Sequence, residues 1–248
     1  MKKKCGLILL LFYFTCINSQ QMQNLRNFDN QVYHMGFVLG YNSSDFYLDR
    51  NVLEDFERDS LLVLDVERRP GFNLGFVACL DVSPTFKLRF LPTLSFQERN
   101  LVFTYAIDND STVQWNKQVE STFVEFPLVM KFRTERVKNF AAYCLVGGRF
   151  GLDKASNKDV QNTTASLKDQ VVKIAKSDYG FEVGGGIDLF LEYYKFGIEL
   201  KLSRGLKNVL IQENTQFSTP IDKLRTRIWN LSFTFEGGKG VSLGNKNK

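Results

Sequence analysis

Apolar and polar residues alternate along eight segments of this chain. In the last of them, residues 226–236, one face carries Trp, Leu and Phe side chains and the other carries Asn, Ser, Thr and Glu. Alternation with a period of two is typical of a β-strand that has one apolar and one polar face. The predicted strands are 32–42, 70–82, 86–98, 119–133, 140–152, 178–191, 194–204 and 226–236.

The connections between these segments alternate in length. The short ones are 83–85, 134–139 and 192–193, and the long ones are 43–69, 99–118, 153–177 and 205–225. Barrels of the bacterial outer membrane have short periplasmic turns and longer extracellular loops. The pattern therefore predicts an all-β fold, an antiparallel eight-stranded transmembrane β-barrel in the cell outer membrane, with both the N- and C-termini periplasmic.

A soluble β-sandwich would also alternate, with its apolar face inside. The barrel is favoured because the apolar faces are large and carry aromatic residues near the strand ends, and because the polar faces hold both acids and bases. An eight-stranded barrel is just filled by its own side chains. We therefore expect a packed polar interior and no wide channel. The expected interior charge network consists of Lys87, Arg89, Glu125, Lys131, Glu182, Asp188, Glu199 and Lys201.

The N-terminus has the pattern of a secretory signal peptide. Three lysines precede an apolar stretch that is too short to span a bilayer, so residues 1–20 are predicted to direct Sec-type export. A short membrane anchor and a lipidation site at Cys16 are alternative interpretations. Residues 21–31 would form a periplasmic segment, 32–236 the barrel and 237–248 a basic periplasmic tail. Removal of 1–20 takes three lysines and no acids, so the formal net charge falls from +5 to +2. Such a charge gives no indication of nucleic-acid binding.

Residues with catalytic or metal-binding chemistry are sparse. Cys79 and Cys144 lie in predicted strands, where small apolar wall residues are favoured over a disulfide. His34 is the single histidine and is expected at the periplasmic rim. The chain contains no G-x-S-x-G motif and no phosphate-binding G-x-x-x-x-G-K-[ST] motif. We therefore predict no enzyme activity, metal, cofactor or small-molecule substrate.

Two surfaces could contact partners. In the loop 43–69, the stretch 52–62 could form a short amphipathic helix with Leu53, Phe56 and Leu61 on one side. That side is either a partner-contact surface or a loop packed on its own barrel. A basic periplasmic rim would suit lipid phosphates or an acidic partner. Its members are Arg133, Arg136, Lys138, Lys239, Lys246 and Lys248.

Several stretches along the chain resemble the PorT family of Bacteroidota outer-membrane β-barrel proteins. They are residues 24–30 (NLRNFDN), 69–75 (RPGFNLG), 88–96 (LRFLPTLSF), 120–128 (ESTFVEFPL), 178–188 (DYGFEVGGGID) and 221–227 (IDKLRTR). The resemblance implies a role in type IX secretion, which exports proteins with C-terminal sorting domains. It implies contacts with outer-membrane lipid and with other secretion components, and it carries over no catalytic residues. An adhesion barrel acting through its outer loops and a lipid-modifying barrel enzyme are the alternatives.

Overall fold

The computed structural model describes residues 24–50, 61–108, 111–156 and 166–237. One turn of 3-10 helix, η1 (Phe28–Asn30), precedes an antiparallel sheet. Within the described residues no helix is long and apolar enough to cross a membrane. The strands are β1 (Tyr33–Arg50), β2 (Leu61–Asp81), β3 (Phe86–Phe90), β4 (Thr93–Asp108), β5 (Ser111–Glu125), β6 (Leu128–Arg133), β7 (Phe140–Asp153), β8 (Ser177–Phe190), β9 (Lys195–Gly205) and β10 (Ile221–Gly237).

The sheet closes into a barrel, as predicted. Its ten described strands make up eight strand positions in the wall, here called staves. β3 and β4 are one stave interrupted at Pro92, and β5 and β6 are another interrupted at Pro127. Proline has no backbone N–H and breaks the hydrogen-bond ladder at its position. The neighbouring strands bridge both gaps, because Phe76 N donates to Pro92 O and Leu91 N donates to Pro127 O, each at 3.0 Å. Pairing of β1 with both β10 and β2 closes the barrel.

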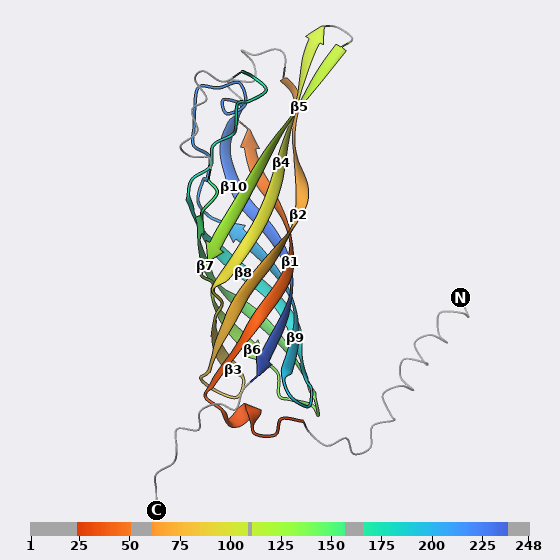
Figure 1. Ribbon diagram of the computed structural model, residues 1–248, viewed down its shortest axis with the longest axis vertical. Coiled ribbons are helices and arrows are strands. Elements are labelled where there is room, and N and C mark those ends of the chain that lie inside the picture. Colours follow the sequence, from red (N-terminus) through yellow and green to blue (C-terminus); the bar gives the residue numbers. More distant parts are fainter. Residues whose placement is uncertain (1–23, 51–60, 109–110, 157–165, 238–248) are drawn as a thin grey trace, which may run out of the picture.

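Two of the predicted long loops are wrong, because strand structure continues through most of them. β1 runs on to Arg50 and β2 begins at Leu61, while β4 and β5 form a hairpin that reaches Asp108 and Ser111. Figure 1 shows this hairpin projecting from the top of the barrel, at the end opposite η1. The described residues of the predicted loops 153–177 and 205–225 do lie mostly outside strands.

The continuation was missed because the polarity of the strands inverts along the barrel. In the lower part apolar side chains point outward, as Phe76 on β2 does with 72% of its surface exposed. In the upper part the apolar side chains point inward, and Phe103 on β4 is fully buried. The outward positions beside it, such as Asp65 and Asn116, are polar and exposed. An apolar inner face with a polar outer face is the pattern of a sheet in water.

The height at which the polarity inverts marks the extracellular edge of the apolar, membrane-facing belt on the outside of the barrel. Short turns at 82–85, 134–139 and 191–194 lie at the η1 end, which therefore faces the periplasm. The described chain begins and ends at this end, since Met35 pairs with Gly237. The upper part, with its polar outer face, extends into the extracellular medium.

Candidate functional site

The barrel interior at the periplasmic end of the belt is organised around a fully buried arginine. Arg89 on β3 donates from Nη1 to Glu199 Oε2 at 2.6 Å, and its Nη2 lies 3.6 Å from Glu236 Oε1. The hydroxyl of Tyr143 donates to the same Glu199 oxygen at 3.1 Å. These contacts join four strands, β3, β7, β9 and β10, through one cation.

Two buried lysines extend this cluster. Lys131 Nζ contacts both carboxylate oxygens of Asp188 at 2.8 and 2.9 Å and lies 3.5 Å from the centre of the Tyr143 ring. Lys195 Nζ donates to Glu236 at 2.7 Å. A buried charge is tolerated only when it is paired and hydrogen-bonded. Because each of these buried charges needs its partner, their side chains are held in place and fill this layer of the interior.

A glycine makes room for the tyrosine in this layer. A Cβ on Gly186 would lie 2.6 Å from the Tyr143 Cζ and hydroxyl oxygen, closer than real Cβ atoms approach. Gly186 therefore has a structural role at this point, because a larger residue would displace the hydroxyl from Glu199.

A second charge cluster lies above the first. Arg149 on β7 donates to Glu125 at 3.0 Å and to Asp178 at 2.6 Å. Lys201 connects the two clusters, because its Nζ lies 3.3 Å from Glu182 and 3.5 Å from Glu199. Ion pairs thus run through both layers of the interior.

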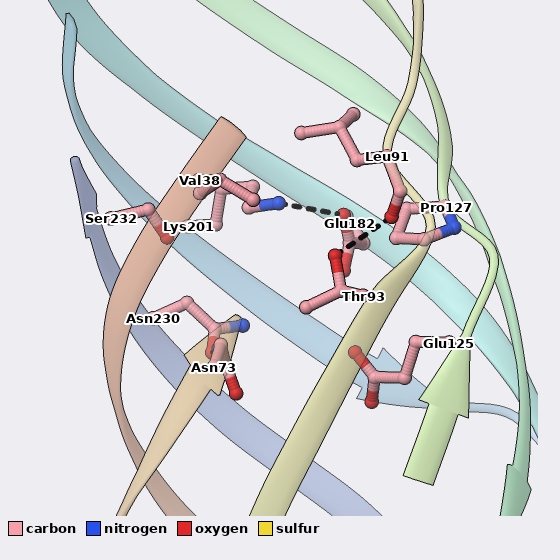
Figure 2. Close-up of a pocket in the computed structure, with 10 residues that line it drawn as sticks. All are labelled: Val38, Asn73, Leu91, Thr93, Glu125, Pro127, Glu182, Lys201, Asn230 and Ser232. Carbon is pink, nitrogen blue, oxygen red and sulfur yellow. Dashed lines mark hydrogen bonds and ion pairs between the residues drawn. The ribbon is translucent and has the colours of Figure 1, made fainter. Parts of the chain in front are cut away.

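A cavity of about 20 Å³ lies between these clusters. Figure 2 shows Lys201 directed at Glu182 in its wall, with Val38 and Leu91 among the apolar lining residues. A cavity of this volume has room for one water molecule, and its carboxylate, ammonium and amide groups could hold that water. It is too small for a substrate or for a hydrated ion path.

The structure places all eight charges expected inside the barrel at buried positions. Seven of them take part in the two clusters just described, and Lys87 forms an ion pair with Asp81 near the periplasmic end. Other network members were not singled out from the sequence. They are Asp81, Tyr143, Arg149, Asp178, Lys195 and Glu236. Strand alternation places Glu236 on the polar face of the last predicted strand, and it could likewise have found Asp178 and Lys195.

The periplasmic mouth is closed by the segment before β1. Phe28 of η1 is 3% exposed, and its ring stacks on His34 with centroids 3.9 Å apart. The same ring meets Phe190 edge-on at 5.7 Å. His34 lies 3.3 Å from Asp81. His34 thus lies at the periplasmic end of the barrel, as predicted. It is buried beneath the segment before β1, here called the plug, and is not exposed on a rim.

The plug also uses part of the predicted basic rim. Arg133 is 2.8 Å from Asp29, and Arg136 lies 3.5 Å from the other oxygen of that carboxylate. Arg136 also donates to the backbone carbonyl of Asn24, and its guanidinium covers the Phe190 ring at 3.7 Å. These two arginines are therefore engaged by the protein itself, and binding of an outside partner by the basic rim stays a prediction. The lysines at 239, 246 and 248 lie outside the described residues.

Replacement of Phe28 by alanine is expected to open the periplasmic mouth. The thiol of Cys79 is fully buried on the inner wall, and Cys79 pairs with His34 in the sheet register. In a chain that lacks residues 1–20 and carries Cys144→Ala, Cys79 is the single thiol, and loss of the Phe28 ring should raise the rate at which a maleimide labels it. Val32→Ala removes an exposed side chain next to the plug and should leave that rate unchanged. Equal rates in all three proteins would contradict a plug held by Phe28.

Cys79 and Cys144, the cysteines among the described residues, do not form a disulfide in this fold. Cys79 is buried and Cys144 is exposed, and both are free. The interpretation of both as small wall residues is consistent with this placement.

The extracellular mouth is closed by an apolar core. Segments 166–176 and 206–220 fold over it, and their buried side chains pack against inward residues of β1, β2, β4 and β5. The Phe217 ring lies 5.1 Å from that of Phe103 and 6.4 Å from that of Tyr105. Lys117 covers Phe217 at 4.2 Å and donates to the backbone carbonyl of Leu167. Together with the charge clusters, this core fills the described interior with packed side chains from the periplasmic to the extracellular end.

Of the three predicted partner-contact residues, Leu61 is the one that the structure describes. Leu61 is the first residue of β2, and its side chain packs against the extracellular core. A helix reaching Leu61 is therefore wrong. Leu53 and Phe56 lie outside the described residues.

A closed eight-stave barrel with an apolar outer belt and polar interior is the architecture of an outer-membrane β-barrel protein. The family model described as "Outer membrane protein beta-barrel domain" matches residues 19–210, more than half of the chain. The chain belongs to this family and is a protein of the outer membrane.

Solved structures of other outer-membrane proteins are similar in fold. OprG from Pseudomonas aeruginosa has 11% sequence identity and a TM-score of 0.46, over 88% of this chain and 99% of its own. Ail of Yersinia pestis, solved in complex with the heparin analogue sucrose octasulfate, has 14% identity and a TM-score of 0.36, over 82% and 98%. No curated protein sequence matches the chain. At this level of similarity no function is carried over from these structures.

Proposed function

We propose that this protein is an accessory component of the type IX secretion system, of the PorT type, which supports export through protein contacts and is not itself the conduit. The proposal is supported by the PorT-like stretches, which run from Asn24 to the start of the last strand. Membership of the outer-membrane barrel family is consistent with it.

The observation that carries the accessory role is the closure of the barrel at three levels. Phe28 fills the periplasmic mouth, the ion-pair clusters around Arg89 and Arg149 fill the middle, and the core around Phe217 fills the extracellular mouth. Passage of a polypeptide would require all three to be displaced. Separating the buried ion pairs alone costs several kcal/mol each. Contacts on the outside of the barrel are therefore the remaining route to a role in secretion.

The test is the secreted proteome of a strain in which the gene is cleanly deleted. Proteins with C-terminal sorting domains should accumulate in the periplasm and return to the medium when the gene is restored in trans. Restoration should need export of the chain through its predicted signal peptide, residues 1–20. Normal export in the deletion strain would overturn the proposal.

An adhesion or host-contact barrel is the second candidate, favoured by the extension of β2, β4 and β5 beyond the belt. This extension presents a polar outer face, including Asp65 and Asn116, to the medium. Replacing residues 99–118 with a short turn should abolish adhesion if the extension is a receptor-binding surface. Adhesion that survives this shortening would count against a role as an adhesion barrel. Secretion measured in the same strain shows whether export depends on the extension.

A further inference from the structure

A pocket of about 280 Å³ lies in the barrel wall at the upper edge of the belt. It lies over β2, β4 and β5. The lining residues Phe72, Phe96, Glu98, Glu120 and Thr122 share one face of these strands. By strand alternation these five side chains are on the outer face, since the intervening Gln97 and Ser121 are buried inside. The pocket therefore opens on the outer face, and the inward residues Gln97 and Ser121 contribute to its lining.

An irregularity in strand pairing creates the pocket. The register between β2 and β4 shifts between Arg68 and Phe72, so the residues between them have no partner on β4. Gly71 sits at this bulge, where a Cβ would come within 2.1 Å of the Phe96 carbonyl oxygen. Only glycine permits this close backbone approach. Bulges bend a strand and often occur next to functional sites.

The pocket lies where lipid headgroups meet the protein. Below it on the outer face of β2 are Phe72, Leu74 and Phe76, all exposed apolar side chains. Above it the outer face becomes polar, beginning with Glu98 on β4 and Glu120 on β5. Aromatic side chains at such a border are typical of the interface between hydrocarbon and headgroups.

The chemistry of the pocket favours a cation. Phe72 and Phe96 stack against each other beside the carboxylates, with ring centroids 4.4 Å apart. Glu98 and Glu120 are direct cross-strand partners, and like charges in this position destabilise a sheet. Among the described residues, Glu98 has no side-chain hydrogen bond or ion pair, while Glu120 accepts a hydrogen bond only from Gln118 at 3.0 Å. A cation bound between the two carboxylates would relieve their repulsion.

We propose that this pocket binds the primary ammonium headgroup of an outer-leaflet lipid. The ammonium group can donate to both carboxylates, while the acyl chains follow the aromatic pair and the apolar wall below it. An ammonium is favoured over Ca²⁺ or Mg²⁺, because two carboxylates would leave most of the coordination positions of either metal to water or lipid oxygens. In the described part of the chain no group of three or more His, Cys, Asp and Glu side chains could hold a metal.

The test is native mass spectrometry of the full-length protein released from nanodiscs that contain equal amounts of phosphatidylethanolamine and phosphatidylglycerol. The wild type should retain phosphatidylethanolamine in preference. In the variant Glu98→Gln/Glu120→Gln that preference should fall about tenfold, the ratio expected when charge-assisted hydrogen bonds are lost. The matched control is Glu135→Gln/Glu192→Gln, which removes two exposed acids from the periplasmic turns and should retain lipid as the wild type does.

Three outcomes would overturn the proposal. They are equal retention of the two lipids by the wild type, unchanged preference in the Glu98/Glu120 variant, and loss of the preference when EDTA is added. The last result would assign the two carboxylates to a divalent cation that bridges lipid phosphates. Circular dichroism of each variant establishes that it is folded before its lipids are compared.

Discussion

Replacing Arg89 with methionine should destabilise the barrel by about 3–5 kcal/mol, the cost of leaving a buried ion-pair partner without its counter-charge. Arg89 is fully buried, and its guanidinium serves both Glu199 and Glu236. Methionine has a similar length and cannot pair with either carboxylate. The measurement is a urea titration of the protein folded in lipid vesicles, followed by tryptophan fluorescence and by heat-modifiable migration in gels.

Two further variants separate a lost charge from lost packing. Arg69→Met removes an exposed arginine whose partner Glu67 is also exposed, and should change the free energy of unfolding by no more than about 1 kcal/mol. Adding Glu199→Gln to Arg89→Met removes one of the two stranded charges and should recover part of the loss. A stability of Arg89→Met equal to that of the wild type would mean that the interior cluster is not assembled around this residue.

Replacing Leu231 with arginine should cost about 2–4 kcal/mol, because the charge would face hydrocarbon near the middle of the membrane. Leu231 is on the outer face of β10, 38% exposed, and pairs with Leu200 on one side and Tyr41 on the other. These neighbours place it within the apolar belt. The free energy of unfolding in lipid vesicles gives the cost directly.

The matched control is the same substitution outside the belt. Leu206 is an exposed leucine immediately after β9, at the extracellular end. Leu206→Arg should cost no more than about 1 kcal/mol, because the penalty falls toward the interface. Equal costs at the two positions would mean that the outward face of β10 does not contact lipid.

The membrane-spanning part of the fold could be predicted from the sequence because lipid imposes a regular outward pattern. Alternation such as that of residues 226–236 identifies both the strand and its outward face. The prolines that divide two staves left this alternation intact, so Pro92 and Pro127 did not hide the strands around them. Above the belt the outer face meets water and the inner face meets an apolar core. The pattern there inverts, and residues 99–118 were consequently predicted to be a loop.

The interior charges could be predicted as a group, but their pairing could not. Alternation places Arg89 and Glu199 on the inner wall, whereas their 2.6 Å contact depends on the register of strands far apart in the sequence. Register is set by turns and bulges that sequence patterns describe poorly. The Phe28 plug was missed for a related reason: a single aromatic residue before the first strand gives no periodic signal.

The most direct test of the central claim, a barrel closed at both ends and filled between them, is electrical. Full-length protein inserted into a planar lipid bilayer should give no stepwise conductance at any voltage the bilayer tolerates. Insertion is verified in the same preparation by protease protection of the belt. Steady, ohmic conductance steps from the wild-type protein would contradict the closed interior and, with it, the role beside a separate conduit.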